Sequence, residues 1–225
     1  AAIAFNTFRE AIRDRILYSL LVFALAMIGG SVILSRLSVG GEVKIIKDLG
    51  LAAIGLVGTL IAVFIGVGLV YKEIERRTLY TIITKPIRRA EFVLGKFLGL
   101  ALTLAANVAI MGAGLLLLAS AMEARLTWEL LLPVALTFVK LMVVTAIAVL
   151  FSTFSTPMLS ALFTLAVYFT GHVTEGLMLL KARLQAPASR LLCDVLYYLL
   201  PNLENFDLKH QAVHGLPLGE GRVLL

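Results

Sequence analysis

Four polar residues stand inside apolar stretches that are long enough to cross a membrane. Lys140 lies near the middle of the stretch 130–151, and Asn107 lies within 97–121. His172 and Glu175 are one helical turn apart in 158–180, so their side chains could touch. A charge at mid-depth costs at least ~2.5–3.5 kcal/mol and needs a partner or water. We predict either a substrate or proton path at these residues or structural polar contacts that fix helix register.

Sequence patterns that carry soluble enzyme chemistry are absent. The "GKF" at Gly95 lacks the upstream glycine and the Ser or Thr of a phosphate-binding loop, so ATP hydrolysis is expected on another chain. Neither HExxH nor GxSxG occurs. His210 and His214 have a spacing that could hold a metal on a helix, but Gly215 and Pro217 follow at once and no third ligand is fixed. We therefore predict no catalytic residue and no metal site.

Composition places these residues in a bilayer. The 225-residue chain is 60% hydrophobic and 15% charged, which is more apolar surface than a soluble domain of this size could hide. Five stretches are long enough to span, and because lipid cannot satisfy backbone groups they must be helical: 16–35, 49–70, 97–121, 130–151 and 158–180. The expected fold is all-α and polytopic, a single domain over 1–225. We expect a sixth span after an extracytoplasmic segment 181–225.

The basic residues predict orientation. Three Lys or Arg lie in the N-terminal segment and seven in the loop 72–96, against four near the opposite ends of the spans. The positive-inside rule therefore places the N-terminus and the loop 72–96 in the cytoplasm. The net charge of +6 flanks apolar runs and is not interleaved with stacking aromatics, so we predict no nucleic-acid partner.

The N-terminal segment 1–15 reads as an amphipathic helix in the inner interface. Phe5, Phe8 and Ile12 recur at helical spacing, while Arg9 and Arg13 face elsewhere. Among the spans, small residues at four-residue spacing predict close helix packing, chiefly static: Gly58, Ala62 and Gly66 in the second span and Ala101, Ala105, Ala109 and Ala113 in the third.

The loop 72–96 has an apolar stripe that positive-inside charge does not explain. A short helix from Lys72 to Thr84 would align Ile74, Leu79, Ile82 and Ile83. Pro86 disfavours helix at Lys85, and a new helix then begins near Arg89 and continues into the third span.

Here the chain resembles the permease subunit of type-two ATP-binding-cassette (ABC-2) exporters. The loop between their second and third spans typically has Glu, then Gly-Thr-Leu, then Pro with a basic residue and Glu, then Gly-Lys. The matching residues here are Glu75, Thr78, Leu79, Pro86, Arg89, Glu91, Gly95 and Lys96, with Arg77 where the family usually has Gly. The N-terminal helix is similar to the family's elbow helix, "FSTFSTP" at 151–157 to its tight inner turn, and "LPNLENFDLK" at 200–209 to the stretch after span five in one branch.

The resemblance implies partners and a docking site for one of them. Such permeases pair as homodimers or heterodimers in the membrane lipid, in bacteria in the inner membrane, and each half docks a cytoplasmic ATPase that carries ATP and Mg. The resemblance implies docking through the loop residues Glu73, Glu75, Arg76, Arg77, Thr78, Leu79, Ile82, Pro86, Arg88, Arg89 and Glu91. No cofactor is expected on this chain. The alternative is a membrane-embedded enzyme, or an assembly or scaffold factor without transport activity.

Overall fold

The described part of the chain is built from helices. A computed structural model describes residues 2–36, 41–75, 89–123 and 127–172, without the side chains of 69–75 and 89–90. Its elements are α1 (Ala2–Ile12), α2 (Arg15–Ser35), α3 (Glu42–Glu75), α5 (Arg89–Glu123), the short 3-10 helix η1 (Trp128–Leu130), α6 (Leu131–Ser152) and α7 (Pro157–His172). Every regular element in these ranges is helical, which confirms the all-α fold class.

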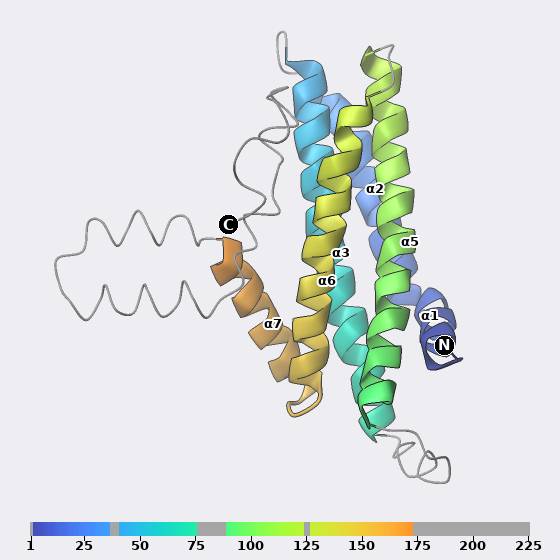
Figure 1. Cartoon of the computed structure of the whole chain (residues 1–225). Coiled ribbons are helices and arrows are strands. Elements are labelled where there is room, and N and C mark those ends of the chain that lie inside the picture. Colours follow the sequence, from blue (N-terminus) through green and yellow to red (C-terminus); the bar gives the residue numbers. More distant parts are fainter. Residues whose placement is uncertain (1, 37–40, 76–88, 124–126, 173–225) are drawn as a thin grey trace, which may run out of the picture.

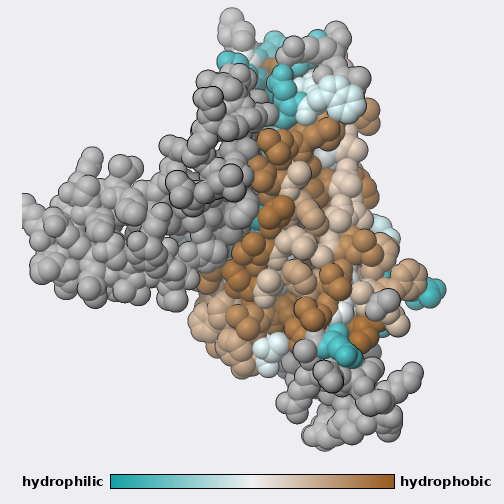
Figure 2. All heavy atoms as spheres, viewed as in Figure 1, coloured by the Kyte–Doolittle hydropathy of each residue, from teal (hydrophilic) through white to brown (hydrophobic). Residues whose placement is uncertain are grey.

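Four of the helices are long and apolar enough to cross a membrane. They cover Arg15–Ser35, Glu42–Gly68, Glu91–Glu123 and Trp128–Ser152. These helices stand side by side, α7 leans away from them, and α1 lies beside one end of α5 (Figure 1). Figure 2 shows apolar residues over the middle of this bundle and hydrophilic ones toward its two ends, as a bilayer requires. The polytopic membrane fold is thereby confirmed, while the predicted span 158–180 is described only as far as His172.

Helix α3 is longer than the apolar run that predicted it. It begins at Glu42 instead of 49, so Lys44 and Lys47 belong to a helix and not to a loop. At its other end it continues to Glu75 without a break at Lys72, where a separate loop helix was predicted to begin. No Gly or Pro lies between Tyr71 and Glu75, and Glu and Lys are good helix formers, so the helix has no local reason to stop.

Helix α3 is also the centre of the bundle. It contacts α2, α5, α6 and α7. The predicted row of small residues lies against α6: a Cβ at Gly58 would strike Leu141, and one at Gly66 would lie 3.5 Å from the Ala148 Cβ. The row in α5 behaves differently, because Ala101 is buried whereas Ala109 and Ala113 are exposed. Residues four apart turn by about 40° per step around a helix, so a long row leaves the contact face.

Hydroxyl groups inside the bundle are mostly satisfied by their own helices. Each donates to a carbonyl three or four residues earlier, a bond that removes a polar group from an apolar surrounding. This set includes Ser31, Thr59, Thr103, Thr137, Thr145, Ser152 and Thr164. Their presence at depth therefore does not by itself mark a polar path.

Candidate functional site

Two of the predicted polar residues meet between α6 and α7. Lys140 Nζ lies 3.1 Å from His172 Nε2, although the two residues are 32 positions apart. His172 Nδ1 lies 3.1 Å from the Tyr168 carbonyl oxygen. A carbonyl oxygen only accepts, so Nδ1 carries the ring proton, and the Nε2 lone pair of a neutral imidazole accepts from the Lys140 ammonium. The pair thus joins α6 to α7 through a charge-assisted hydrogen bond.

The surroundings of Lys140 are dry and aromatic. Its side chain is only 2% exposed. The ammonium stands 6.0 Å from the centroid of the Tyr168 ring, and this ring lies 4.4 Å from the imidazole of His172. A cation at that distance over an aromatic face is attracted to it. The Lys140 charge is therefore held by side chains of α7 and not by bulk water.

Of the two remaining predicted polar residues, only Asn107 is described, and it lies elsewhere in the bundle. Asn107 on α5 is buried, and its Nδ2 donates to the Thr103 carbonyl at 2.8 Å. Its Oδ1 has no hydrogen-bond partner among the described residues. No hydrogen bond in the described ranges links Asn107 to Lys140 or His172, so the structure does not join the three into one network. Glu175 lies outside the described residues.

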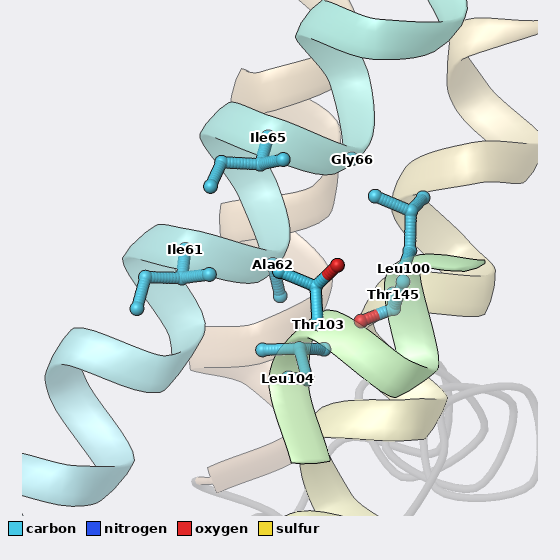
Figure 3. A pocket seen from close by; sticks show the side chains of 8 residues that line it. All are labelled: Ile61, Ala62, Ile65, Gly66, Leu100, Thr103, Leu104 and Thr145. Atoms are coloured by element: carbon cyan, nitrogen blue, oxygen red, sulfur yellow. The ribbon is translucent and has the colours of Figure 1, made fainter. Parts of the chain in front are cut away.

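A crevice in the bundle core is apolar and narrow. It lies between α3, α5 and α6, and Figure 3 shows its lining residues: Ile61, Ala62, Ile65, Gly66, Leu100, Thr103, Leu104 and Thr145. The hydroxyls of Thr103 and Thr145 donate to Gly99 and Leu141 of their own helices. The crevice leaves no room for a water molecule. Within the described chain, this part of the bundle core is a closed helix seam.

An ion pair that the sequence did not reveal closes the end of the bundle remote from α1. Lys47 Nζ on α3 lies 2.6 Å from Glu123 Oε1 on α5, with side chains 6% and 15% exposed. Thr127 donates to the other carboxylate oxygen at 3.3 Å. Burial of both partners strengthens the attraction between the charges, adds a desolvation cost, and makes the loss of either partner alone costly. The only signal in the sequence was that both residues fall near the same predicted membrane surface.

The opposite end of α5 holds α1. A Cβ at Gly95 would approach Ile3 Cγ2 to 2.8 Å, and one at Gly99 would approach the Ala4 carbonyl oxygen to 2.6 Å. Only glycine lets the two helices come so close. Beside this contact, the buried ammonium of Lys96 lies 4.0 Å from Glu10 Oε2. The N-terminal helix is thus seated on the first turns of α5.

Most residues of the predicted coupling loop lie outside the described residues. These are Arg76, Arg77, Thr78, Leu79, Ile82, Pro86 and Arg88. The backbone of Glu73 and Glu75 forms the last turn of α3, and Arg89 is the first residue of α5. Glu91 is exposed in the first turn of α5, where a carboxylate interacts favourably with the helix dipole. The loop's two ends therefore leave the bundle from the end at which α1 lies (Figure 1).

The candidate metal ligands His210 and His214 also lie outside the described residues. Within those residues, no group of three or more His, Cys, Asp or Glu side chains could hold a metal. Sequence reasoning had named Lys140 and His172 separately, and the structure shows that they are partners.

Comparison with known proteins finds one family model, described as ABC-2 family transporter protein, which matches residues 1–191. No curated protein and no solved structure shows a significant match to the chain.

Proposed function

The chain belongs to the ABC-2 transporter family, and on that premise we propose that it is the permease subunit of an ATP-driven exporter. Membership makes it the membrane component of an ABC transporter and implies an ABC ATPase partner. The observation that carries the proposal is the family match over residues 1–191, in a chain whose described part contains four helices long enough to span a membrane. ATP and Mg would bind the ATPase subunit, and this chain would need no cofactor.

Coupling to the ATPase is assigned to the loop 72–96. This loop connects α3 and α5, each more than 30 residues long and continuous through the bundle. The far ends of the same two helices are joined by the Lys47–Glu123 ion pair. A push on the loop would therefore move α3 and α5 together as one rigid unit, which fits rigid-body switching between two transporter states.

The cargo path is assigned to a surface shared with a second permease copy. The seam between α3, α5 and α6 is apolar and too narrow for water, which argues against a path through the middle of one bundle. The Lys140–His172 pair lies between α6 and α7, away from that seam. We assign this pair to the wall of the path or to the polar contact that holds α7 in place.

The proposed location is the bacterial inner membrane, with α1 and the loop 72–96 on its cytoplasmic side. Support comes from the basic residues, which are concentrated in those two segments. Labelling with a membrane-impermeant maleimide tests it in a Cys193→Ser background. A cysteine introduced at Ser38 should react from outside intact cells, and one at Ser155 should react only after lysis. The reverse labelling pattern would overturn the orientation.

The deciding test of function is copurification and stimulated ATPase activity. Native purification should return an ABC ATPase with the chain, and co-reconstitution in liposomes should raise ATP hydrolysis. Glu75→Ala with Arg89→Ala should abolish most of the stimulation while insertion and expression stay normal. Glu42→Ala, at the opposite end of α3, is the matched control and should keep it. A chain that purifies alone and stimulates no candidate ATPase would favour the scaffold or enzyme alternative.

A further inference from the structure

Helix α1 presents three different faces, at about 100° of rotation per residue. The face toward the bundle is centred on Thr7 and Ala11, which are fully buried, and Ala4 and Ile3 meet the glycines of α5. Phe5, Arg9 and Arg13, on the other sides of the helix, are exposed.

The second face is apolar and is partly exposed among the described residues. It consists of Phe5, which is 65% exposed, and of Phe8 and Ile12, which are half-buried. An apolar row that the described residues leave partly uncovered, on a helix beside membrane spans, is expected to lie among acyl chains.

The third face is basic, and no described residue neutralises its charges. Arg9 and Arg13 of this face, and Arg15 at the start of α2, are exposed and form no ion pair or hydrogen bond among the described residues. The two acidic residues of the segment are engaged elsewhere. Glu10 faces Lys96, and Asp14 accepts from the Ile16 backbone N–H at 3.0 Å as the N-cap of α2. The outward charge of α1 is therefore positive.

We propose that Arg9, Arg13 and Arg15 bind the headgroups of anionic phospholipids. The neighbouring face with Phe5 and Ile12 would insert between acyl chains, which places the three guanidinium groups at the depth of the phosphates. Guanidinium groups match phosphate oxygens in a bidentate way, and basic residues next to a membrane attract anionic lipids. The occupant is a lipid, because a soluble anion would leave the exposed Phe5 face without a partner.

Bound lipid would act on α5 through α1. The close contacts at Gly95 and Gly99 join α1 to α5, where the loop 72–96 leads into that helix. Anionic headgroups would thus hold this end of α5 at a constant depth. The binding itself does not depend on transport or on an ATPase.

A tryptophan reporter tests the proposal, because the chain has a single tryptophan, Trp128, on the described η1. The reporter protein carries Trp128→Phe and Phe5→Trp and is reconstituted in vesicles with brominated phosphatidylglycerol or brominated phosphatidylcholine. Bromine quenching should show an anionic-lipid preference of at least threefold at position 5. Each arginine can contribute up to about fivefold to such a preference. The triple change Arg9→Gln, Arg13→Gln and Arg15→Gln should abolish this preference, so that the two lipids quench equally.

Two controls keep the test decisive. Arg36→Gln, an exposed arginine at the other end of α2, should leave the preference at position 5 unchanged. Salt close to 1 M, where the Debye length is about 3 Å, should weaken the preference without any substitution of the arginines. Equal quenching by the two lipids, or a preference that survives the triple change and high salt, would overturn the proposal.

Discussion

The seat of α1 on α5 can be tested with a single methyl group. A Cβ added at Gly99 would lie 2.6 Å from the Ala4 carbonyl oxygen and 2.5 Å from the Thr7 Cβ. A backbone oxygen cannot rotate away, so α1 must shift as a body. Overpacking of this kind costs about 1–3 kcal/mol, while alanine gains about 0.8–1 kcal/mol over glycine in helix propensity. The Gly99→Ala variant should therefore be less stable than wild type by up to about 2 kcal/mol.

Gly29→Ala in α2 provides the matched control. The same substitution there has the same propensity gain, and nothing lies within 4 Å of the added Cβ. The control should be as stable as wild type or up to about 1 kcal/mol more stable. The difference between the two variants, about 1–3 kcal/mol, isolates the α1–α5 contact.

The assay is SDS-induced unfolding in mixed micelles, followed by helix content. A second readout is the rate of trypsin cleavage after Arg13, which lies in the turn between α1 and α2 and should become more accessible when α1 is displaced. If Gly99→Ala unfolds at the same SDS concentration as Gly29→Ala and is cleaved at the wild-type rate, α1 does not contact Gly99 in the membrane. That result would refute our reasoning.

Two further contacts allow similar tests. His172→Ala should destabilise the chain by about 1.5–3 kcal/mol, because it removes an acceptor of the buried Lys140 ammonium. The double variant Lys140→Met with His172→Leu should be better tolerated, because it leaves no buried charge. A double variant that is less stable than His172→Ala in SDS unfolding would contradict this. For the ion pair, a double-mutant cycle with Lys47→Met and Glu123→Gln should give a coupling energy of about 1 kcal/mol or more, and a value near zero would mean that the pair does not join α3 to α5. Stimulated ATPase activity of the same variants would show whether this link also serves coupling.

Much of the fold could be predicted because a bilayer imposes strong local rules. An apolar run such as 130–151 has to be a helix, since lipid offers no partner to its backbone groups. The same rule located α2 and α6 within a few residues of their observed limits, whereas α5 begins at Arg89, well before the predicted span 97–121. The ends of α3 were harder to predict. Hydropathy predicts a loop for the charged residues at 42–48 and 72–75. In the structure these residues belong to α3, so the helix extends beyond its apolar run at both ends.

The candidate site was less accessible from the sequence. Lys140 stood out because a charge at mid-membrane is costly, but its partner His172 is 32 residues away and was grouped with Glu175 on local spacing. The Lys47–Glu123 contact spans 76 residues and had no motif. For α1, the row of Phe5, Phe8 and Ile12 marked the apolar face, but the sequence did not show that the helix contacts the bundle through the small residues Thr7 and Ala11.

The sequence by itself determined that the chain is a helical membrane protein and where its apolar runs and its clusters of basic residues lie. Hydropathy, the helix break predicted at Pro86 and the distribution of Lys and Arg depend on neighbours in sequence, so they can be read without coordinates. The tertiary structure decided which polar groups share a partner and which face of α1 meets α5. Those outcomes depend on how helices rotate and approach one another, and at Gly99 the approach is set by the absence of a single Cβ.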